Sequence, residues 1–306
     1  MAPGTIRWNL SDSIALVVNE LEPLGQGACS TVYSGHLDST KVAVKRPAPG
    51  PDGTRIQGIS EVEILSQLSH GNILKFFGTR TNPLGTADIV LELAEGVTLA
   101  RALFQRRNLT DSWKRLTIYQ ISDGLAYLHE RNIIHLDLKP PNILFRDREL
   151  QQPLIADFGM ARKAAVSYRA GARKFRAPDH PRYTRESDVF SLASIACCIL
   201  SERNPSDEDE TRAIVSRVLN STSYDAIQLT ALSGGVQRNP SLRPTAARFR
   251  DAFDKPPHRL EIPSMEIAYQ ADDNAPNPCR WVAFVALIVV ICLILAALFT
   301  RMFSSK

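Results

Sequence analysis

The segment from residue 133 to residue 145 constrains this chain more than any other stretch. It reads IIHLDLKPPNILF and carries an acid, a cation and an amide close together, at Asp137, Lys139 and Asn142. The two adjacent prolines predict a loop rather than a helix, and the apolar residues on both sides predict that a core holds this loop. A second acid, Asp157, lies near the end of another apolar run. Two acids and an amide held on short segments are what a magnesium–nucleotide site requires.

Composition places the chain among globular proteins and excludes some functions. Its 306 residues are 44% hydrophobic and 22% charged, which suits one two-lobed domain or two ordinary domains. The net charge of +4 is small for this length and no nucleic-acid-binding signature is present, so nucleic acid is not an expected partner. The five cysteines show neither metal-ligand spacing nor a disulfide framework, which indicates a reducing compartment.

A run of twenty residues without a charge, 281–300, lies between Arg280 and Arg301. About 20 apolar residues at a rise of about 1.5 Å each cross a hydrocarbon core of about 30 Å. A buried core helix is the alternative, but the run is uniformly apolar, which favours a single transmembrane helix. A linker at 256–280 precedes this helix, and a short tail at 301–306 follows it.

Residues 20–93 show the alternation that is typical of short strands joined by turns. In the first turn, 24–32, Gly25 and Gly27 would let backbone amides approach a phosphate with no Cβ between them. An ordinary hairpin turn is the commoner explanation of such a pair, so the context decides. We expect a small lobe with strands at 20–27, 30–37, 41–47, 70–78 and 88–93 and one helix at 54–69.

A hinge at 94–96 separates this lobe from a larger, mainly helical lobe at 97–255, so the fold class is α+β. The segment 188–200 contains the run FSLASIACCIL, which has almost no polar face and predicts a buried helix. The acidic run 207–210 is expected to be a solvated loop. Helices are predicted at 99–106, 112–130, 188–200, 214–219, 225–232 and 246–253.

In this order and spacing, the segments from 20 to 255 resemble the protein kinase family, with an N-terminal extension at 1–19. The motifs that carry the resemblance are the glycine-rich turn, the strand VAVK ending at Lys45, Glu61 in the first helix, HLDLKPPN, DFG beginning at Asp157, and RAPD. Each match is weak alone, whereas the joint match is specific. The resemblance implies a two-lobed protein-kinase fold.

The resemblance implies four catalytic residues. Lys45 would hold the α- and β-phosphates of a nucleotide, and Glu61 would fix its ammonium group by an ion pair. Asp137 would accept the proton of the substrate hydroxyl, and Lys139 would neutralise charge on the transferred phosphoryl group. Protein substrates are the implied partners.

ATP and Mg²⁺ are the implied cofactors. Asp157 would bind a Mg²⁺ that bridges phosphate oxygens, and Asn142 would hold a second one. Adenine would lie between apolar side chains of the two lobes, with Leu91 in the gatekeeper position. The resemblance assigns ATP binding to Leu24, Gly25, Gln26, Gly27, Val32, Ala43, Lys45, Leu91, Glu92, Ala94 and Leu144.

Lys139 followed by proline resembles the serine/threonine type of kinase, and the general run of the sequence resembles the tyrosine-kinase-like group. Leu136 replaces the arginine that normally pairs with a phosphorylated activation segment. The chain is therefore of the non-RD type, and we expect its activity not to depend on that phosphate. Ala172 stands where such kinases usually carry a threonine that contacts catalytic residues. Asp179 replaces a glutamate and is expected to pair with Arg243.

Two functions of different classes follow. One is a membrane-anchored kinase that phosphorylates serine and threonine hydroxyls of proteins, and the other is an ATP-binding pseudokinase that acts as a membrane scaffold. Basic residues around the activation segment favour acidic substrates, although a solvated surface or contact with anionic lipid would also explain them. The terminal span predicts a tail-anchored, single-pass protein of the endoplasmic reticulum or mitochondrial outer membrane, with the kinase domain facing the cytosol.

Overall fold

The structure is a computed structural model, and it describes most of the span from residue 10 to residue 253. The predicted membrane helix at 281–300, its linker and its tail lie outside the described residues. In the part of the chain that is described, no helix is long and apolar enough to cross a membrane. Ala172 also lies outside this part. The described residues are 10, 14–27, 30–48, 59–82, 87–105, 109–163, 173–179 and 182–253.

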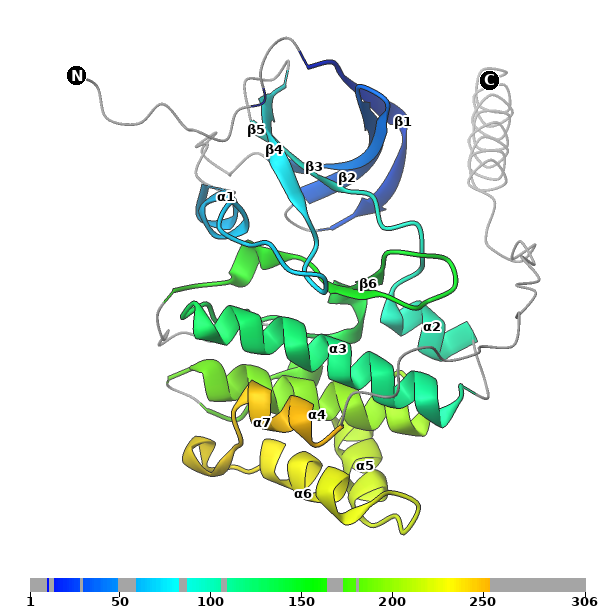
Figure 1. Cartoon of the computed structure of the whole chain (residues 1–306), viewed down its shortest axis with the longest axis vertical. Coiled ribbons are helices and arrows are strands. Elements are labelled where there is room, and N and C mark those ends of the chain that lie inside the picture. The colour runs from blue at the N-terminus through cyan, green and yellow to red at the C-terminus, as the bar shows by residue number, and fades with distance from the viewer. Residues whose placement is uncertain are drawn as a thin grey trace, which may run out of the picture. The chain divides into compact units, whose positions relative to one another are not determined.

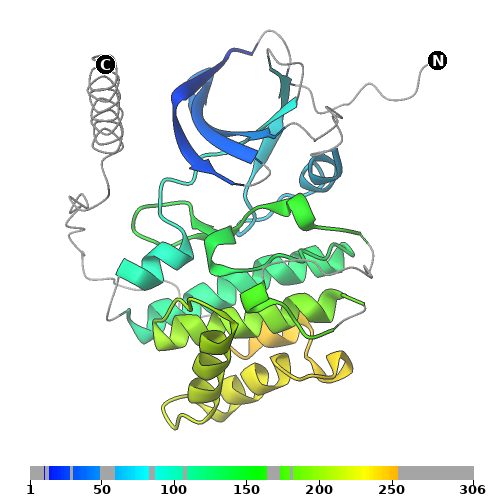
Figure 2. The ribbon, with the colours of Figure 1, turned by 180° about the vertical axis from the view of Figure 1, so that it is seen from behind.

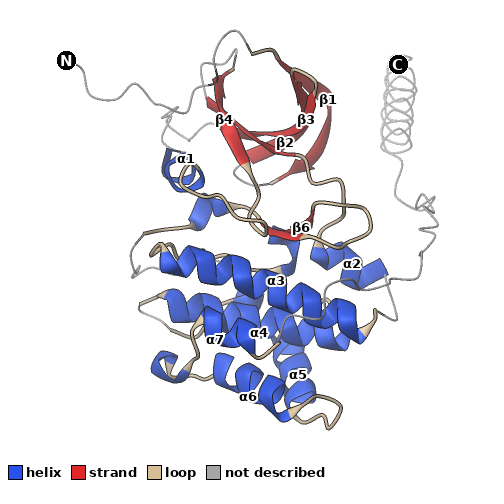
Figure 3. Cartoon of the chain, viewed as in Figure 1, coloured by secondary structure: helices blue, strands red, loops and turns tan. Residues whose placement is uncertain are grey.

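The smaller lobe is a five-stranded antiparallel sheet with one helix beside it, as predicted (Figure 1, Figure 3). The strand order is β1-β2-β3-β5-β4. Val42 and Val44 are fully buried on one face of the sheet, while Ala43 between them joins the main core on the other face. The elements are β1 (Leu16–Gln26), β2 (Ser30–Leu37), β3 (Thr40–Pro47), α1 (Ile59–Leu65), β4 (Phe76–Thr81) and β5 (Ala87–Glu92).

The larger lobe is helical (Figure 2). It is built around α4 (Arg185–Ser201), which is buried along nearly its whole length. This burial confirms the prediction from its apolar run. Caps define several helix starts: Thr110 accepts a hydrogen bond from Trp113 N at 3.2 Å at the start of α3. The other elements are α2 (Leu99–Gln105), α3 (Asp111–Glu130), α5 (Glu208–Leu219), α6 (Ala226–Gly235), α7 (Ala246–Asp251) and the 3₁₀ turns η1 (Pro140–Asn142), η2 (Phe158–Met160), η3 (Arg173–Phe175) and η4 (Pro240–Leu242).

A two-stranded sheet that the sequence did not predict lies between the lobes. It pairs β6 (Ile143–Phe145) with β7 (Pro153–Ile155). Ile155 also forms a bridge with Ile73, and Leu144 forms one with Thr98. Since these bridges come from segments on either side of β4 and β5, the small sheet fixes the segments that carry Asn142 and Asp157 relative to the smaller lobe.

Several predicted boundaries of the smaller lobe are wrong. The helix predicted at 54–69 ends at Leu65. β1 begins at Leu16 rather than at residue 20, because Leu16 to Asn19 continue the pairing with β2; four residues assigned to the N-terminal extension belong to the sheet. The strand predicted at 70–78 begins only at Phe76, because its first residues form a turn in which Ile73 N donates to His70 O at 3.2 Å.

The sequence predicted a solvated loop at the acidic run 207–210, and this prediction is wrong. Asp207 is the N-cap of α5, and its carboxylate accepts a hydrogen bond from Glu210 N at 2.8 Å. Acids in a first helical turn also interact favourably with the helix dipole. The helix therefore begins at Glu208, six residues before the predicted start at residue 214.

Candidate active site

A cation and two carboxylates from three separate elements meet at the first part of the site. Lys45 Nζ on β3 lies 2.7 Å from Glu61 Oε1 on α1 and 2.9 Å from Asp157 Oδ1 after β7. The side chains of Lys45 and Glu61 are 12% and 7% exposed, whereas that of Asp157 is 49% exposed. The sequence-predicted pair of Lys45 and Glu61 is therefore formed, and Asp157 joins it from the solvent side.

The alternation of β3 and the apolar stripe of α1 together produce this contact. Lys45 pairs with Val32 and Ile89 in the sheet, and it lies on the same face as Ala43, which points toward the main core. On α1, Val62 and Leu65 are buried in that core. Glu61 is carried on the same short helix, which brings its carboxylate over β3.

The charges of this group shift one another's pKa values. Burial raises the pKa of Glu61 in spite of Lys45, whereas the contacts of Lys45 and Asp157 outweigh burial. Burial by itself would lower the pKa of Lys45, but the carboxylates of Glu61 and Asp157 outweigh burial and raise that pKa above its ordinary value of 10.5. Burial also works against the Asp157 carboxylate, but Lys45 outweighs it and holds the pKa of Asp157 below 3.8. Lys45 and Asp157 are both charged at neutral pH as a result.

The second part of the site is the loop that carries Asp137. Lys139 Nζ donates to Asp137 Oδ2 at 2.7 Å. Asn142 Nδ2 donates to the same carboxylate at 3.1 Å and to the Asp137 carbonyl oxygen at 2.8 Å. The acid, cation and amide that the sequence singled out therefore form one hydrogen-bonded unit.

A carboxylate from α4 holds this loop from below. Asp188, which is 1% exposed, accepts hydrogen bonds from His135 N at 2.7 Å and Leu136 N at 2.9 Å, and it lies 3.0 Å from His129 Nε2. Leu136 has a left-handed backbone with φ of 66°, a conformation that costs a leucine about 1 kcal/mol. The hydrogen bonds from Asp188 fix that conformation, and with it the direction of Asp137.

The two parts of the site are joined through Ala156. Its amide donates to Asn142 O at 2.9 Å, and its carbonyl oxygen lies 3.1 Å from His135 Nε2. Asp157 follows directly and has a left-handed backbone with φ of 63°. This geometry places the Asp157 carboxylate beside the loop that carries Asp137.

The oxygen ligands suit Mg²⁺. Asp157 offers a half-exposed carboxylate, and Asn142 donates through its amide nitrogen, which leaves its amide oxygen as an available ligand. Among the described residues, no group of three or more histidine, cysteine or acidic side chains could hold a metal alone. Mg²⁺ typically takes one or two protein oxygens and completes its shell with phosphate and water, so the residues fit this ion.

The predicted adenine-binding residues share one apolar cluster. Ala43 and Leu91 are buried in it, and Val32, Ala94 and Leu144 pack against it while remaining partly exposed. Ala43 pairs with Leu91 between β3 and β5, and Leu144 forms a bridge with Thr98; that these side chains hold adenine stays a prediction.

Four further predicted ATP-binding residues, Leu24, Gly25, Gln26 and Gly27, lie at the end of β1. Leu24 is 55% exposed, and Gln26 is the last residue of the strand. Gly27 N donates to Ser30 O at 2.8 Å in the hairpin that leads to β2. A Cβ at Gly25 would meet no atom within 4 Å, so the space beside its backbone is open to a ligand.

Glu92 is a further predicted residue whose side chain has a structural contact. Its carboxylate accepts from Lys75 N at 2.9 Å and from Arg146 Nε at 3.2 Å. The side chain is thus engaged between the lobes, and its backbone remains the part that could meet a base.

Three contacts around the site extend the sequence analysis. Arg243 Nη2 lies 2.6 Å from Asp179 Oδ1 in a buried pair, which confirms the predicted partner of Asp179. The sequence missed Asp188 as the anchor of the catalytic loop; an acid near the start of an otherwise apolar helix was the signal. It also missed that Leu136 packs with Ile134 and Tyr183 in a separate apolar cluster.

Comparison with known proteins gives consistent matches. The protein kinase domain model matches residues 18–252. Cysteine-rich receptor-like protein kinase 36 of Arabidopsis thaliana is 34% identical over 228 residues, which cover 68% of this chain and 34% of that protein. A probable LRR receptor-like serine/threonine-protein kinase of the same plant is 34% identical over 198 residues, covering 59% of this chain and 20% of that protein.

A third relative covers more of the chain. Serine/threonine-protein kinase ATG1c of Arabidopsis thaliana is 27% identical over 285 residues, which cover 83% of this chain and 38% of that protein. The matched region thus spans between 20% and 38% of the length of these three relatives.

Proposed function

This chain belongs to the protein kinase family, and from that premise we propose that it transfers the γ-phosphate of ATP to serine and threonine hydroxyls of proteins. One observation carries the proposal: Lys45 contacts Glu61 at 2.7 Å and Asp157 at 2.9 Å at once. A lysine that phosphates will contact is thereby held in position before ATP arrives. The serine/threonine type rests on Lys139 and the proline after it, and the tyrosine-kinase-like group rests on the general run of the sequence.

Each side chain has a role that follows from its position. Lys45 orients the α- and β-phosphates, and Glu61 holds the ammonium group in place. Asp137 accepts the proton of the attacking hydroxyl, while Lys139, 2.7 Å from it, balances negative charge on the transferred group. Asn142 and Asp157 would hold Mg²⁺, which neutralises charge on the phosphate oxygens when it is bound.

Phosphate transfer by the full-length chain tests this proposal. The chain is incubated with labelled ATP, Mg²⁺ and a set of generic acidic and basic proteins. We expect Asp137→Asn to lower transfer by about 100-fold or more, since a positioned general base contributes about 10²–10⁴-fold. Equal phosphate transfer by the unmodified chain and by Asp137→Asn would contradict the assignment of Asp137 as the general base. If the unmodified chain and Asp137→Asn both bind ATP and neither transfers phosphate, the scaffold alternative would be favoured.

We also propose that residues 281–300 anchor the chain in a membrane. Twenty residues without a charge support this, and the need for ATP favours a cytosolic kinase domain. The endoplasmic reticulum and the mitochondrial outer membrane are the candidate membranes. Alkaline extraction of membranes from expressing cells should leave the chain in the pellet. Release of the full-length chain into the supernatant would contradict an anchor.

The non-RD character supports a further part of the proposal. Leu136 is 8% exposed and packs against apolar residues, so it supplies no cation for a phosphorylated activation segment. We expect Ser167→Ala combined with Tyr168→Phe to leave phosphate transfer within about twofold of the unmodified chain, because the loop is fixed by Asp188 instead. Loss of transfer in this variant would contradict that view.

Acidic proteins are the proposed substrates. The segment around η3 carries Arg173, Lys174 and Arg176. It packs against α5, at whose start Asp207 lies close enough to Lys174 for its pKa, already lowered by the hydrogen bond from the backbone of Glu210, to be lowered further. Reversing the charge of Arg173 and Lys174 should shift preference toward basic substrates. An unchanged ratio of transfer to acidic and basic proteins would contradict this preference.

A further inference from the structure

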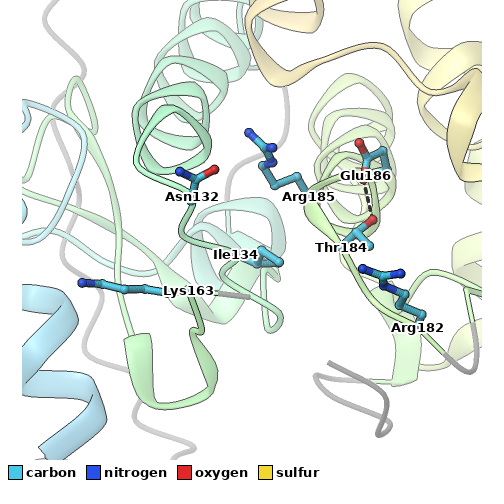
Figure 4. Close-up of a pocket in the computed structure, with 7 residues that line it drawn as sticks. All are labelled: Asn132, Ile134, Lys163, Arg182, Thr184, Arg185 and Glu186. Carbon is cyan, nitrogen blue, oxygen red and sulfur yellow. Dashed lines mark hydrogen bonds between the residues drawn. The ribbon is translucent and has the colours of Figure 1, made fainter. Parts of the chain in front are cut away.

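A pocket of about 260 Å³ lies apart from the nucleotide site, where three segments of the larger lobe meet (Figure 4). One segment is the turn after α3, the second follows η2, and the third leads into α4. Together they bring polar side chains from distant parts of the sequence around one space. The residues that line it are Asn132, Ile134, Lys163, Arg182, Thr184, Arg185 and Glu186.

The lining carries three cations and a single carboxylate. Arg185 Nη1 donates to the backbone oxygen of His129 at 3.0 Å, and Lys163 Nζ donates to the side-chain amide oxygen of Gln67 at 2.7 Å. The Arg182 side chain forms no hydrogen bond within the described part of the chain. None of the three cations forms an ion pair with a carboxylate there. Donor groups remain available on Arg182 and Arg185, whereas Figure 4 shows the Lys163 side chain extending away from the two arginines.

The single carboxylate does not balance these cations. Glu186 accepts a hydrogen bond from the hydroxyl group of Thr184, and Figure 4 shows this contact between them. The stretches 164–172 and 180–181, which adjoin Lys163 and Arg182 in sequence, contain no acid. The region therefore holds an excess of positive charge that favours an anion.

The pocket adjoins the catalytic loop. Ile134 lines it and also packs with Leu136 and Tyr183, and Ile134 N donates to Arg162 O at 2.8 Å. Ile134 precedes Asp137 by three residues, which span at most about 11 Å of extended chain. A group bound in the pocket would thus lie within the reach of a peptide whose hydroxyl is at Asp137.

The chemistry of the lining fits a phosphoryl group better than a carboxylate. The guanidinium groups of Arg182 and Arg185 can give hydrogen bonds to phosphate oxygens, and the amide of Asn132 adds a further donor. A phosphorylated side chain brings nearly two negative charges and three acceptor oxygens at pH 7, against one charge for glutamate. The two arginines therefore attract a phosphoryl group more strongly than a carboxylate.

We propose that this pocket binds the phosphoryl group of a phosphorylated residue on a polypeptide. In a substrate, that residue would lie a fixed distance from the accepting hydroxyl, so the kinase would prefer proteins that are already phosphorylated. This preference rests on the proposed function, whereas binding of the phosphoryl group does not. The chain's own Ser167 or Tyr168, once phosphorylated, is the second possible source of the same group.

Fluorescence anisotropy of labelled degenerate peptides tests the binding. The full-length chain is titrated with peptides that carry a central phosphothreonine, threonine or glutamate. We expect the phosphothreonine set to bind at least about tenfold more tightly than either other set, the effect of about 1.4 kcal/mol from one charge-assisted contact. Equal affinity for the phosphothreonine and glutamate sets would overturn the proposal.

Paired variants locate the binding. Arg182→Gln with Arg185→Gln should remove the phosphothreonine preference, while its melting temperature reports whether the chain remains folded. Arg217→Gln with Arg248→Gln changes two exposed arginines elsewhere and should keep the preference. An unchanged preference in the first variant, or an equal loss in the second, would overturn the proposal.

The remaining arms separate the sources. Ser167→Ala with Tyr168→Phe assigns the pocket to a substrate if peptide affinity is unchanged, and to the chain's own phosphate if affinity rises. Binding to anionic vesicles that depends on Arg182 and Arg185, without binding of phosphopeptides, would assign the pocket to a lipid surface and overturn the proposal. If the chain binds the phosphopeptides but transfers no phosphate, binding of the phosphoryl group by the pocket would stand and the proposed function would be rejected.

Discussion

The two halves of the active site are built in different ways. The half around Asp137 is held by Asp188, which is 1% exposed and accepts two hydrogen bonds from the backbone of this half. The half around Lys45 depends on ion pairs, and one partner, Asp157, has a side chain that is 49% exposed. The first half is fixed by the core of the larger lobe, while the second depends on the distance between separate elements.

This difference predicts that the halves respond differently to change. Removing a buried acceptor leaves polar groups without partners in a place that water does not reach, which costs much free energy. Removing one member of the Lys45 group leaves a second carboxylate near the same lysine and lets water enter. Damage to the first half should therefore mainly lower the stability of the protein, and damage to the second should mainly impair nucleotide binding.

The largest expected effect is that of Asp188→Ala. The change leaves the amides of His135 and Leu136 and the ring of His129 without their acceptor. We expect the free energy of unfolding to fall by about 3–5 kcal/mol, since an uncompensated buried site is strongly destabilising. The melting temperature should fall by roughly 10 °C in a thermal scan.

Asp209→Ala is the matched control for that change. Asp209 is also an acid in the first turn of a helix, but its side chain is 91% exposed. Its removal should change the free energy of unfolding by no more than about 0.5 kcal/mol. A similar loss in both variants would show that burial of Asp188 is not what fixes the catalytic loop.

Compared with Asp188→Ala, Glu61→Gln should have a smaller effect on stability and a larger effect on nucleotide binding. Lys45 would keep Asp157 at 2.9 Å, so we expect a loss of about 1–2 kcal/mol in the free energy of unfolding. ATP affinity measured by calorimetry should fall about tenfold, because the lysine is no longer held from both sides.

Glu63→Gln makes the same chemical change two residues along the same helix, at an exposed position. It should alter neither the melting temperature nor the ATP affinity beyond about 0.5 kcal/mol. Equal weakening of ATP binding by both changes would mean that the helix, rather than the Lys45 contact, controls affinity.

The sequence predicted that the acid, the cation and the amide of one loop lie together, because their spacing is local. Asp137, Lys139 and Asn142 lie within one short loop, and the structure joins them by hydrogen bonds. The five strands and the buried α4 were also readable from apolar patterns. The run at 70–78 misled, since apolar residues in a turn that packs on a core resemble those of a strand.

What the sequence could not give was contact between distant segments. Nothing local connects Asp188 to the amides of His135 and Leu136, which lie more than fifty residues earlier. Asp207 was misread because an acidic run predicts either a solvated loop or a helix start, and only its hydrogen bond to Glu210 N decides. The pocket that contains Arg182 and Arg185 depends in the same way on how three segments meet.

The smallest expected effect is on the pH dependence of stability. Lys45 lowers the folded-state pKa of Asp157 below 3.8, so its contribution is present above that pH and is lost as pH falls through the folded value. The difference in melting temperature between the unmodified chain and Asp157→Asn should stay constant from about pH 8 to about pH 5. This difference in melting temperature should shrink only as the pH falls toward the folded-state pKa of Asp157.

A difference that shrank near pH 7 would mean that Asp157 titrates far above its ordinary range, contrary to its contact with Lys45. Asp251→Asn is a suitable control, because this exposed carboxylate pairs with Arg250 at 2.9 Å on the surface. Its difference in melting temperature should be small at every pH.

Hydrogen exchange of the full-length chain, with and without ATP and Mg²⁺, tests the contrast between the halves most directly. The amides of α1 and of residues 157–161 should gain protection when nucleotide binds, because ligand contacts replace ion pairs that open readily. The amides of His135, Leu136 and Asn142 should be strongly protected in both states and change little. A gain at those three amides as large as the gain in α1 would contradict the account.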